Sequence, residues 1–137
     1  MTWMDDQLQA DLQNGFINGN LPAGSLVPEI LTNRRGNTIF NELKNELRTC
    51  THFKLAVAFV TPAVLVPIKS IMMDLAQKGV DGELLTGTYL QFNSPKVFKE
   101  LMKIPNLTVR LTNEAGFHQK GYWFDHDDYE TLIIGSA

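Results

Sequence analysis

A continuous apolar run, Leu55–Val60, is the feature of this sequence that most restricts how the chain can fold. A short run without polar alternation is typical of a strand covered on both faces, and hence of a central strand in a parallel sheet. Thr61 and Pro62 then form the start signal of a helix, an N-cap residue followed by proline. Apolar residues recur at helical spacing as far as Gly79, and a short strand is expected over 83–86. Strand, helix and strand in this order predict a right-handed parallel crossover and an α/β fold.

The rest of the main domain, residues 37–137, continues the alternation of helices and strands. The further elements expected are a helix over 38–48, a helix from Ser94-Pro95 onward, a strand over 107–112, and a final hairpin with strands over 117–125 and 129–135. The turn of that hairpin is His126-Asp127-Asp128. The loop over 87–93 follows the second strand at its carboxyl end, where open α/β sheets bind ligands. Tyr89 in this loop is a candidate pocket residue, although an anchoring role fits it equally well.

Residues 1–36 are expected to form an amino-terminal helix and an extended arm. Over 5–17 the apolar residues recur every fourth position and predict an amphipathic helix: Leu8, Leu12 and Phe16. Prolines and glycines between 21 and 36 favour an extended segment that lies over the main domain.

The charge of the chain limits the partners that it attracts. The formal net charge is −3, so there is no overall attraction to nucleic acid, and any DNA contact requires a local basic patch. The candidates are the pair Arg34-Arg35 and a stripe on the third helix, Lys96, Lys99 and Lys103. A plain solvated face is the commoner meaning of both patterns.

A single cysteine, Cys50, excludes an internal disulfide and suits a reducing compartment, which indicates a cytoplasmic location. Its place between a helix and a buried strand favours a packed thiol over a reactive one. No apolar run approaches the length of a membrane span, and no export signal begins the chain. His, Cys and carboxylate residues show no metal-ligand spacing.

The final hairpin carries the chemically active residue types. Side chains alternate along a strand, so His118 and Lys120 share one face. An imidazole and an ammonium on one face can grip one phosphate, the first as nucleophile or proton donor and the second as a fixed positive charge. Gly135 lets a backbone come close, and Ser136 adds a hydroxyl donor. Asp125 falls on the opposite face, which favours a structural role for it.

This pattern resembles the signature of the phospholipase D-like superfamily, His-x-Lys-x4-Asp followed by Gly-Ser-x-Asn. His118, Lys120 and Asp125 match the first part, and Gly135-Ser136 match the second. The gap before Gly135 is longer than the commonest family spacing, which a longer hairpin turn absorbs. The chain ends at Ala137, where the Asn would follow. The resemblance implies an α/β fold, a phospholipase D-like mixed sheet with flanking helices, truncated at the motif hairpin.

The resemblance is more specific than the superfamily. The segments 53–61, 79–90 and 117–122 look like the phospholipase D-like domain at the amino end of bacterial DEAD/DEAH-type superfamily 2 helicases. No Gly-Lys-Thr/Ser phosphate loop is present, so the link to a helicase rests on resemblance alone. The resemblance implies a metal-independent phosphodiesterase without cofactors, most naturally a nuclease module that acts on DNA beside a helicase domain.

The resemblance also assigns roles to residues. The catalytic set that it implies is His118, Lys120, Asp125 and Ser136. The substrate-binding set is Lys120, Gly135, Ser136 and Tyr89. His118 would form a phosphohistidine or act as the partner acid, and Glu114 would orient its ring. Family members use two such motifs, so a second would come from a homodimer or from further sequence, and residues 1–137 by themselves are expected to be weakly active or inactive.

Two other functions stay open at this level. The domain fits a non-catalytic module that holds nucleic-acid phosphate or a partner for the helicase. Hydrolysis of lipid phosphodiesters uses the same chemistry and is the third reading, although the chain has neither an export signal nor an obvious membrane face.

Overall fold

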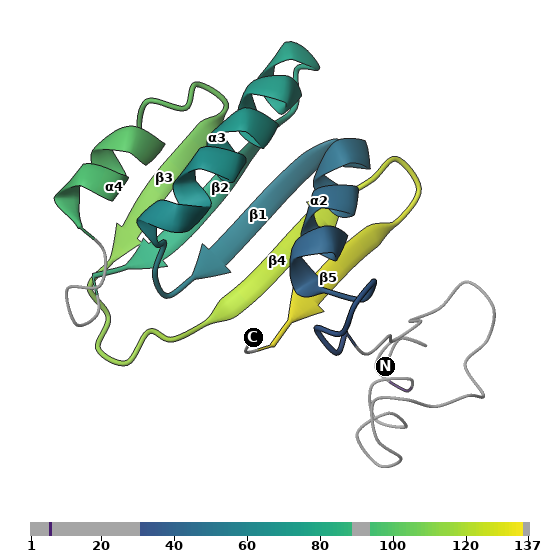
Figure 1. Ribbon diagram of the computed structural model, residues 1–137, viewed down its shortest axis with the longest axis horizontal. Helices are drawn as coiled ribbons and strands as arrows, with labels where there is room; N and C mark the ends of the chain where they lie inside the picture. Colours follow the sequence, from purple (N-terminus) through teal and green to yellow (C-terminus); the bar gives the residue numbers. More distant parts are fainter. Residues whose placement is uncertain (1–5, 7–30, 89–93, 136–137) are drawn as a thin grey trace.

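The computed structural model describes residues 6, 31–88 and 94–135 (Figure 1). The elements, in chain order, are α2 (Ile39–Thr49), β1 (His52–Val57), α3 (Pro62–Gln77), β2 (Asp81–Gly87), α4 (Pro95–Leu101), β3 (Leu107–Thr112), β4 (Lys120–Asp125) and β5 (Glu130–Ile134). Tyr89, Ser136, the arm up to residue 30 and nearly all of the helix expected over 5–17 lie outside the described residues, so those predictions stay predictions.

One five-stranded mixed sheet, in the order β3-β2-β1-β4-β5, organises the described chain. β1 pairs with β2, and β2 with β3, in parallel, while β4 runs antiparallel to both β1 and β5. The predicted parallel crossover, the central position of the first strand and the final hairpin are therefore confirmed. The helix starts are confirmed as well, because Thr61 and Ser94 are N-caps with proline directly after them.

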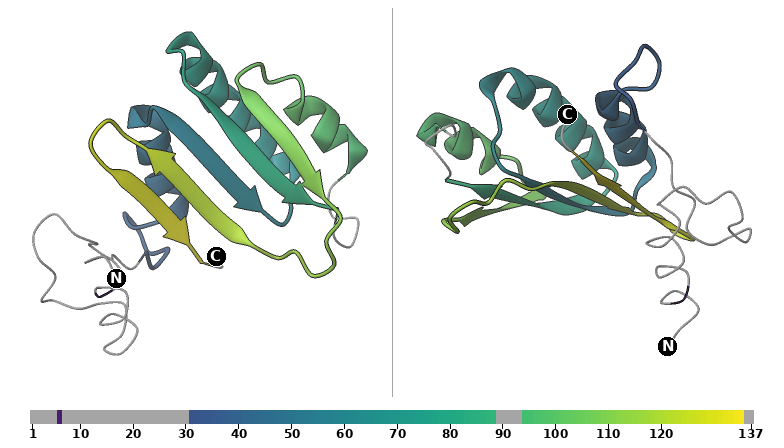
Figure 2. Two further views of the ribbon diagram at one scale, coloured as in Figure 1. Left: turned by 180° about the vertical axis from the view of Figure 1, so that it is seen from behind. Right: turned by 90° about the horizontal axis from the view of Figure 1, so that it is seen from below.

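The three described helices lie on the same face of the sheet, as the right-hand view of Figure 2 shows. The prediction that Leu55–Val60 forms a strand covered on both faces is therefore wrong. β1 ends at Val57, and the remaining apolar residues belong to the bend that leads into α3. Leu55 and Val57 pack into the core under the helices, whereas Lys54, on the other face, is exposed. The run contains no polar residue because the strand position that faces away from the helices, Ala56, is occupied by a small apolar residue.

The core lies between this face of the sheet and the helices. Phe53 of β1 and Phe124 of β4 are paired across the two strands, and neither is exposed to solvent. Cys50 is buried beside them, and its burial raises the pKa of the thiol to about 11. The expectation of a packed thiol is confirmed by this burial. A thiol whose pKa is raised forms little thiolate, the reactive species, at neutral pH.

Two lysines of the predicted stripe, Lys96 and Lys99, lie on α4, the third, Lys103, lies in the turn after it, and all three are exposed. Lys103 donates to Glu100 at 2.7 Å, and Lys69 of α3 donates to the same carboxylate. These hydrogen bonds, that from Lys103 first, lower the pKa of Glu100 to about 2. Met102, the C-cap of this helix, is 74% exposed.

Gly82 makes the closest backbone approach in the core, and its replacement by alanine is expected to destabilise the fold. Gly82 pairs with Phe53 across β1 and β2, and a Cβ atom there would lie 2.3 Å from Cε2 of the Phe53 ring. Because that ring is fully buried, it cannot move aside without displacing its neighbours. We expect Gly82→Ala to lower the free energy of unfolding by about 2–3 kcal/mol, measured by urea denaturation.

Gly121 of β4 is the matched control for this substitution. A Cβ atom there would meet nothing within 4 Å, so Gly121→Ala is expected to change the free energy of unfolding by less than about 0.5 kcal/mol. Equal effects of the two substitutions would show that the contact with Phe53 does not govern the choice of glycine.

Candidate functional site

The structure brings His118 and Lys120 into direct contact, with 3.2 Å between Nζ of Lys120 and Nε2 of His118. β4 begins at Lys120 rather than at Phe117, so His118 lies in the segment just before the strand. When Lys120 carries its ammonium charge it donates and Nε2 accepts, which places the ring proton of His118 on Nδ1. Both side chains reach the surface, His118 being exposed and Lys120 half-buried.

Phe59 is the third side chain at this position, and no sequence pattern singled it out. Its ring centroid lies 6.5 Å from that of His118, and Nζ of Lys120 lies 6.0 Å from the centre of its ring. The backbone N–H of Ala58 donates to the carbonyl of Gln119 at 2.9 Å and so ties the end of β1 to the start of β4. This long-range contact places an aromatic ring, 38% exposed, beside the His-Lys pair.

The second half of the motif reaches the same place. The backbone N–H of Gly135 donates to the carbonyl of Lys120 at 3.3 Å, so the end of β5 lies against the start of β4. Gly135 has a φ angle of 154°, a backbone conformation that residues other than glycine rarely adopt. The two parts of the sequence motif, separated by the hairpin turn, are therefore adjacent in space, while Ser136 itself lies outside the described residues.

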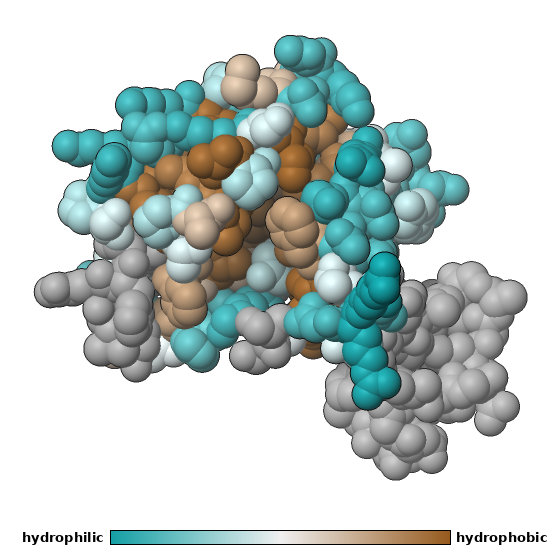
Figure 3. All heavy atoms as spheres, in the orientation of Figure 1, coloured by the Kyte–Doolittle hydropathy of each residue, from teal (hydrophilic) through white to brown (hydrophobic). Residues whose placement is uncertain are grey.

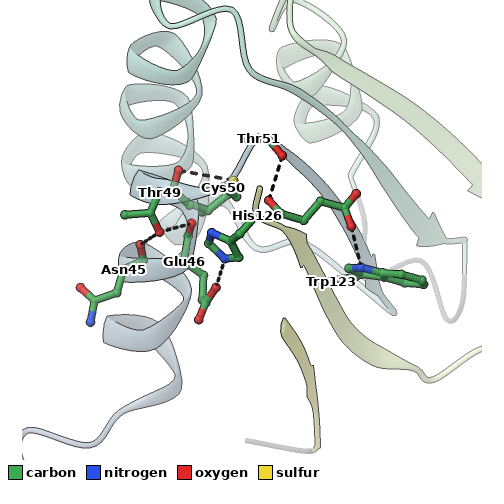
Figure 4. Close-up of polar contacts among 9 residues, drawn as sticks. Asn45, Glu46, Thr49, Cys50, Thr51, Trp123 and His126 are labelled. Atoms are coloured by element: carbon green, nitrogen blue, oxygen red, sulfur yellow. Dashed lines mark hydrogen bonds and ion pairs between the residues drawn. The ribbon is translucent and has the colours of Figure 1, made fainter. Parts of the chain in front are cut away.

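Asp125 does not join this site, which corrects its place in the catalytic set. It is the last residue of β4, about 17 Å along the strand from Lys120 at 3.3–3.4 Å per residue, and on the opposite face. Its carboxylate accepts from Nε1 of Trp123 at 3.1 Å, and its carbonyl accepts from Oγ1 of Thr51 at 3.2 Å (Figure 4). These contacts give Asp125 the structural role that its strand parity indicated.

Glu114 lies in the exposed turn before His118. Its backbone N–H donates to Oγ1 of Thr112, and its carbonyl accepts from Phe117, so the backbone of the turn is held at both ends. The role of its carboxylate in orienting His118 stays a prediction.

An apolar groove opens beside the His-Lys pair, on the face of the sheet that carries the helices. It has a volume of about 270 Å³ and runs between α2 and α3 over β1 and β4, from Lys120 toward Phe124. Its lining is almost wholly apolar, and the residues that enclose it near Lys120 are Val57, Phe59, Val60 and Val64. Figure 3 shows this apolar hollow between the helices. Tyr122 also lines it, and burial raises the pKa of its hydroxyl.

Sequence reasoning missed this groove. The sequence signal for the groove was the apolar run Leu55–Val60, which continues beyond Val57, where β1 ends. In the described part of the chain, no helix has the length and apolarity that crossing a bilayer requires.

The predicted fold class, an α/β fold with a mixed sheet and flanking helices, is confirmed. The solved structure that carries this comparison is polyphosphate kinase from Porphyromonas gingivalis, with a TM-score of 0.52 and 16% sequence identity. The match covers 97% of this chain and 21% of the kinase chain, so this chain spans about a fifth of that protein. At this identity the likeness shows the fold alone.

A second solved structure is more distant. TrmBL2, an archaeal chromatin protein, matches with a TM-score of 0.44 and 13% identity over 88% of this chain and 44% of its own. No protein-family model matches the sequence, and no curated protein does.

Proposed function

We propose that this chain is part of a metal-independent phosphodiesterase of the phospholipase D-like superfamily, in which His118 attacks phosphorus. The observation that carries the proposal is the distance of 3.2 Å between Nζ of Lys120 and Nε2 of His118, with the backbone of Gly135 against Lys120. An ammonium and an imidazole held this close act on the same phosphate, because both lie within reach of groups bonded to one phosphorus atom.

The contact between the two side chains suggests how the nucleophile is released. A non-bridging oxygen of the phosphodiester accepts the N–H that Lys120 otherwise donates to Nε2 of His118. The freed lone pair of Nε2 attacks phosphorus, a P–N bond forms, and the P–O bond to the leaving group breaks. Lys120 stabilises the charge that develops on the phosphoryl oxygens. Water then hydrolyses the phosphohistidine and restores the imidazole.

The leaving oxygen needs a proton, and a second imidazole is the natural donor. In the proposed mechanism that imidazole comes from a second motif, supplied by a homodimer or by further sequence. The resemblance to the helicase-linked branch supports nucleic acid, most naturally DNA, as the substrate and a helicase domain as the partner in the full-length protein.

A non-catalytic module that holds nucleic-acid phosphate, or a partner of the helicase, is the second candidate. The exposed lysines of α4 and of the turn that follows it, Lys96, Lys99 and Lys103, favour it, because they offer a phosphate contact that does not need His118. DNA binding that survives His118→Ala but falls when the three lysines are changed to glutamine would support this second function.

The main test is phosphodiester hydrolysis by the full-length protein in the presence of EDTA. The substrates are single-stranded DNA, double-stranded DNA and bis(p-nitrophenyl) phosphate, a generic phosphodiester. We expect hydrolysis to persist unchanged in EDTA, because His118 and Lys120 supply the nucleophile and the positive charge that metal ions supply elsewhere. An acid-labile phosphohistidine trapped at His118 would add direct support. Loss of all hydrolysis in EDTA would contradict the proposal.

A further inference from the structure

The side chains around the His-Lys pair bear on which form of nucleic acid the proposed site accepts. Phe59 presents a partly exposed ring within 6.5 Å of His118, and a cation, Lys120, lies 6.0 Å from the centre of that ring. Aromatic rings next to cations on a phosphate-binding surface are the standard platforms on which unpaired bases stack. An exposed phenylalanine does not by itself indicate a binding site. Phe59 is of interest because its ring lies beside His118 and Lys120.

The groove provides the space that such a base needs. Its volume of about 270 Å³ exceeds that of an engineered cavity of about 150 Å³ that already binds benzene. Phe59, Val60 and Val64 line it on the same side as Lys120. A base attached to the nucleotide whose phosphate lies at Lys120 can therefore leave its neighbours and lie against these residues.

The lining of the groove also limits how well the site can distinguish one base from another. Three of its lining side chains carry polar atoms, namely Thr61, Lys120 and Tyr122. So few hydrogen-bonding groups cannot distinguish four bases, whereas every base has a flat face that stacks. The groove therefore suits recognition of an unpaired base without choice of its identity.

We propose that the site takes single-stranded nucleic acid, with one unpaired base stacked on Phe59 beside the groove while its phosphate lies against His118 and Lys120. The inference rests on the proposed function, whose substrate class it narrows. A base within a duplex is paired and stacked on its neighbours, so its face is not available to Phe59. Phe59 is thus a specificity-determining residue and not a catalytic one.

The first experiment measures binding without catalysis. The full-length His118→Asn protein is titrated with a fluorescent oligothymidylate, with an oligonucleotide of the same length and charge whose residues are abasic, and with a duplex of that length. We expect the oligothymidylate to bind about 5- to 150-fold more tightly than the abasic strand, the range that stacking of one base produces. We expect an oligoadenylate to match the oligothymidylate closely, because the groove lacks groups that read base edges.

Two variants of Phe59 test the assignment to this ring. Phe59→Leu keeps an apolar wall beside Val60 but removes the flat face, and should abolish the preference over the abasic strand. Phe59→Trp keeps a flat face and should preserve the preference. Equal binding of abasic and base-containing strands by the unsubstituted Phe59 protein would overturn the inference, whatever the variants do.

The failure of this inference can be told apart from failure of the proposed function. Hydrolysis in EDTA with no difference between abasic and base-containing strands would leave the phosphodiesterase standing and remove the base site. A base-dependent affinity that vanishes in Phe59→Leu, without any hydrolysis, would keep the base site and remove the enzyme.

Discussion

Replacing His118 by Asn is expected to lower kcat for phosphodiester hydrolysis by about 10⁴-fold or more. The amide of Asn has no nucleophilic lone pair to attack phosphorus, and it is too short to reach the position of Nε2, which lies 3.2 Å from Nζ of Lys120. The substitution therefore removes the nucleophile and leaves the ammonium of Lys120 in place. The measurement is the single-turnover rate on bis(p-nitrophenyl) phosphate, with the full-length protein in EDTA.

His52 offers the matched control for this substitution. It is a histidine of β1 that is partly exposed, and its Nδ1 lies 3.3 Å from Oδ1 of Asp81. Being at the far end of β1 from Phe59, it has no place in the proposed chemistry, and His52→Asn should leave the rate unchanged. Lys120→Met is expected to lower the rate by about 10²–10³-fold, since it removes charge stabilisation and not the nucleophile. A His118→Asn protein with substantial activity would refute the proposed mechanism.

The second large effect concerns stability, and it arises from a histidine outside the motif. Nε2 of His126 lies 2.5 Å from Oε2 of Glu46, and the two side chains are only 4% and 12% exposed (Figure 4). The His126 ring also stacks on Tyr129, with 4.2 Å between centroids. This pair connects α2 to the β4–β5 turn. Removal of one side chain leaves the polar group of the other buried without this contact. We expect His126→Ala to lower the free energy of unfolding by about 3–5 kcal/mol, measured by urea denaturation.

The pair His52–Asp81 is again the natural comparison, because it also joins a histidine to a carboxylate, but at the surface. Its aspartate is 76% exposed, so His52→Ala should cost less than about 1 kcal/mol. A double substitution, Glu46→Leu with His126→Leu, should restore much of the stability, since no unpaired polar group is then buried. If the effects of Glu46→Leu and His126→Leu simply add, the two residues are not coupled and the interpretation fails.

The histidine of this pair shows one limit of sequence reasoning. His126-Asp127-Asp128 correctly predicted a turn, and residues 126–129 do connect β4 with β5. Nothing local indicated that the His126 side chain is buried, because its partner Glu46 lies 80 positions earlier in the chain. A contact of such sequence separation leaves no periodic signal around either residue.

Local periodicity and capping were enough for the predictions that concern a single element. Strand alternation placed Asp125 on the face opposite Lys120, and cap-then-proline signals located the starts of α3 and α4. These rules hold because they concern neighbours within one element, whereas His118 lies before β4 and its contact with Lys120 is a result of the structure.

Only the tertiary structure decided how the sheet is covered and what surrounds the candidate site. An apolar run does not say which of its residues end a strand, so the open face of the sheet and the bend at Phe59 went unpredicted. The groove exists because α2 and α3 lie apart over β1 and β4, and Phe59 lies beside His118 because Ala58 bonds to Gln119. Each of these arrangements is a packing of distant segments, whose free energy is distributed over many contacts and is not encoded in any one stretch of the chain.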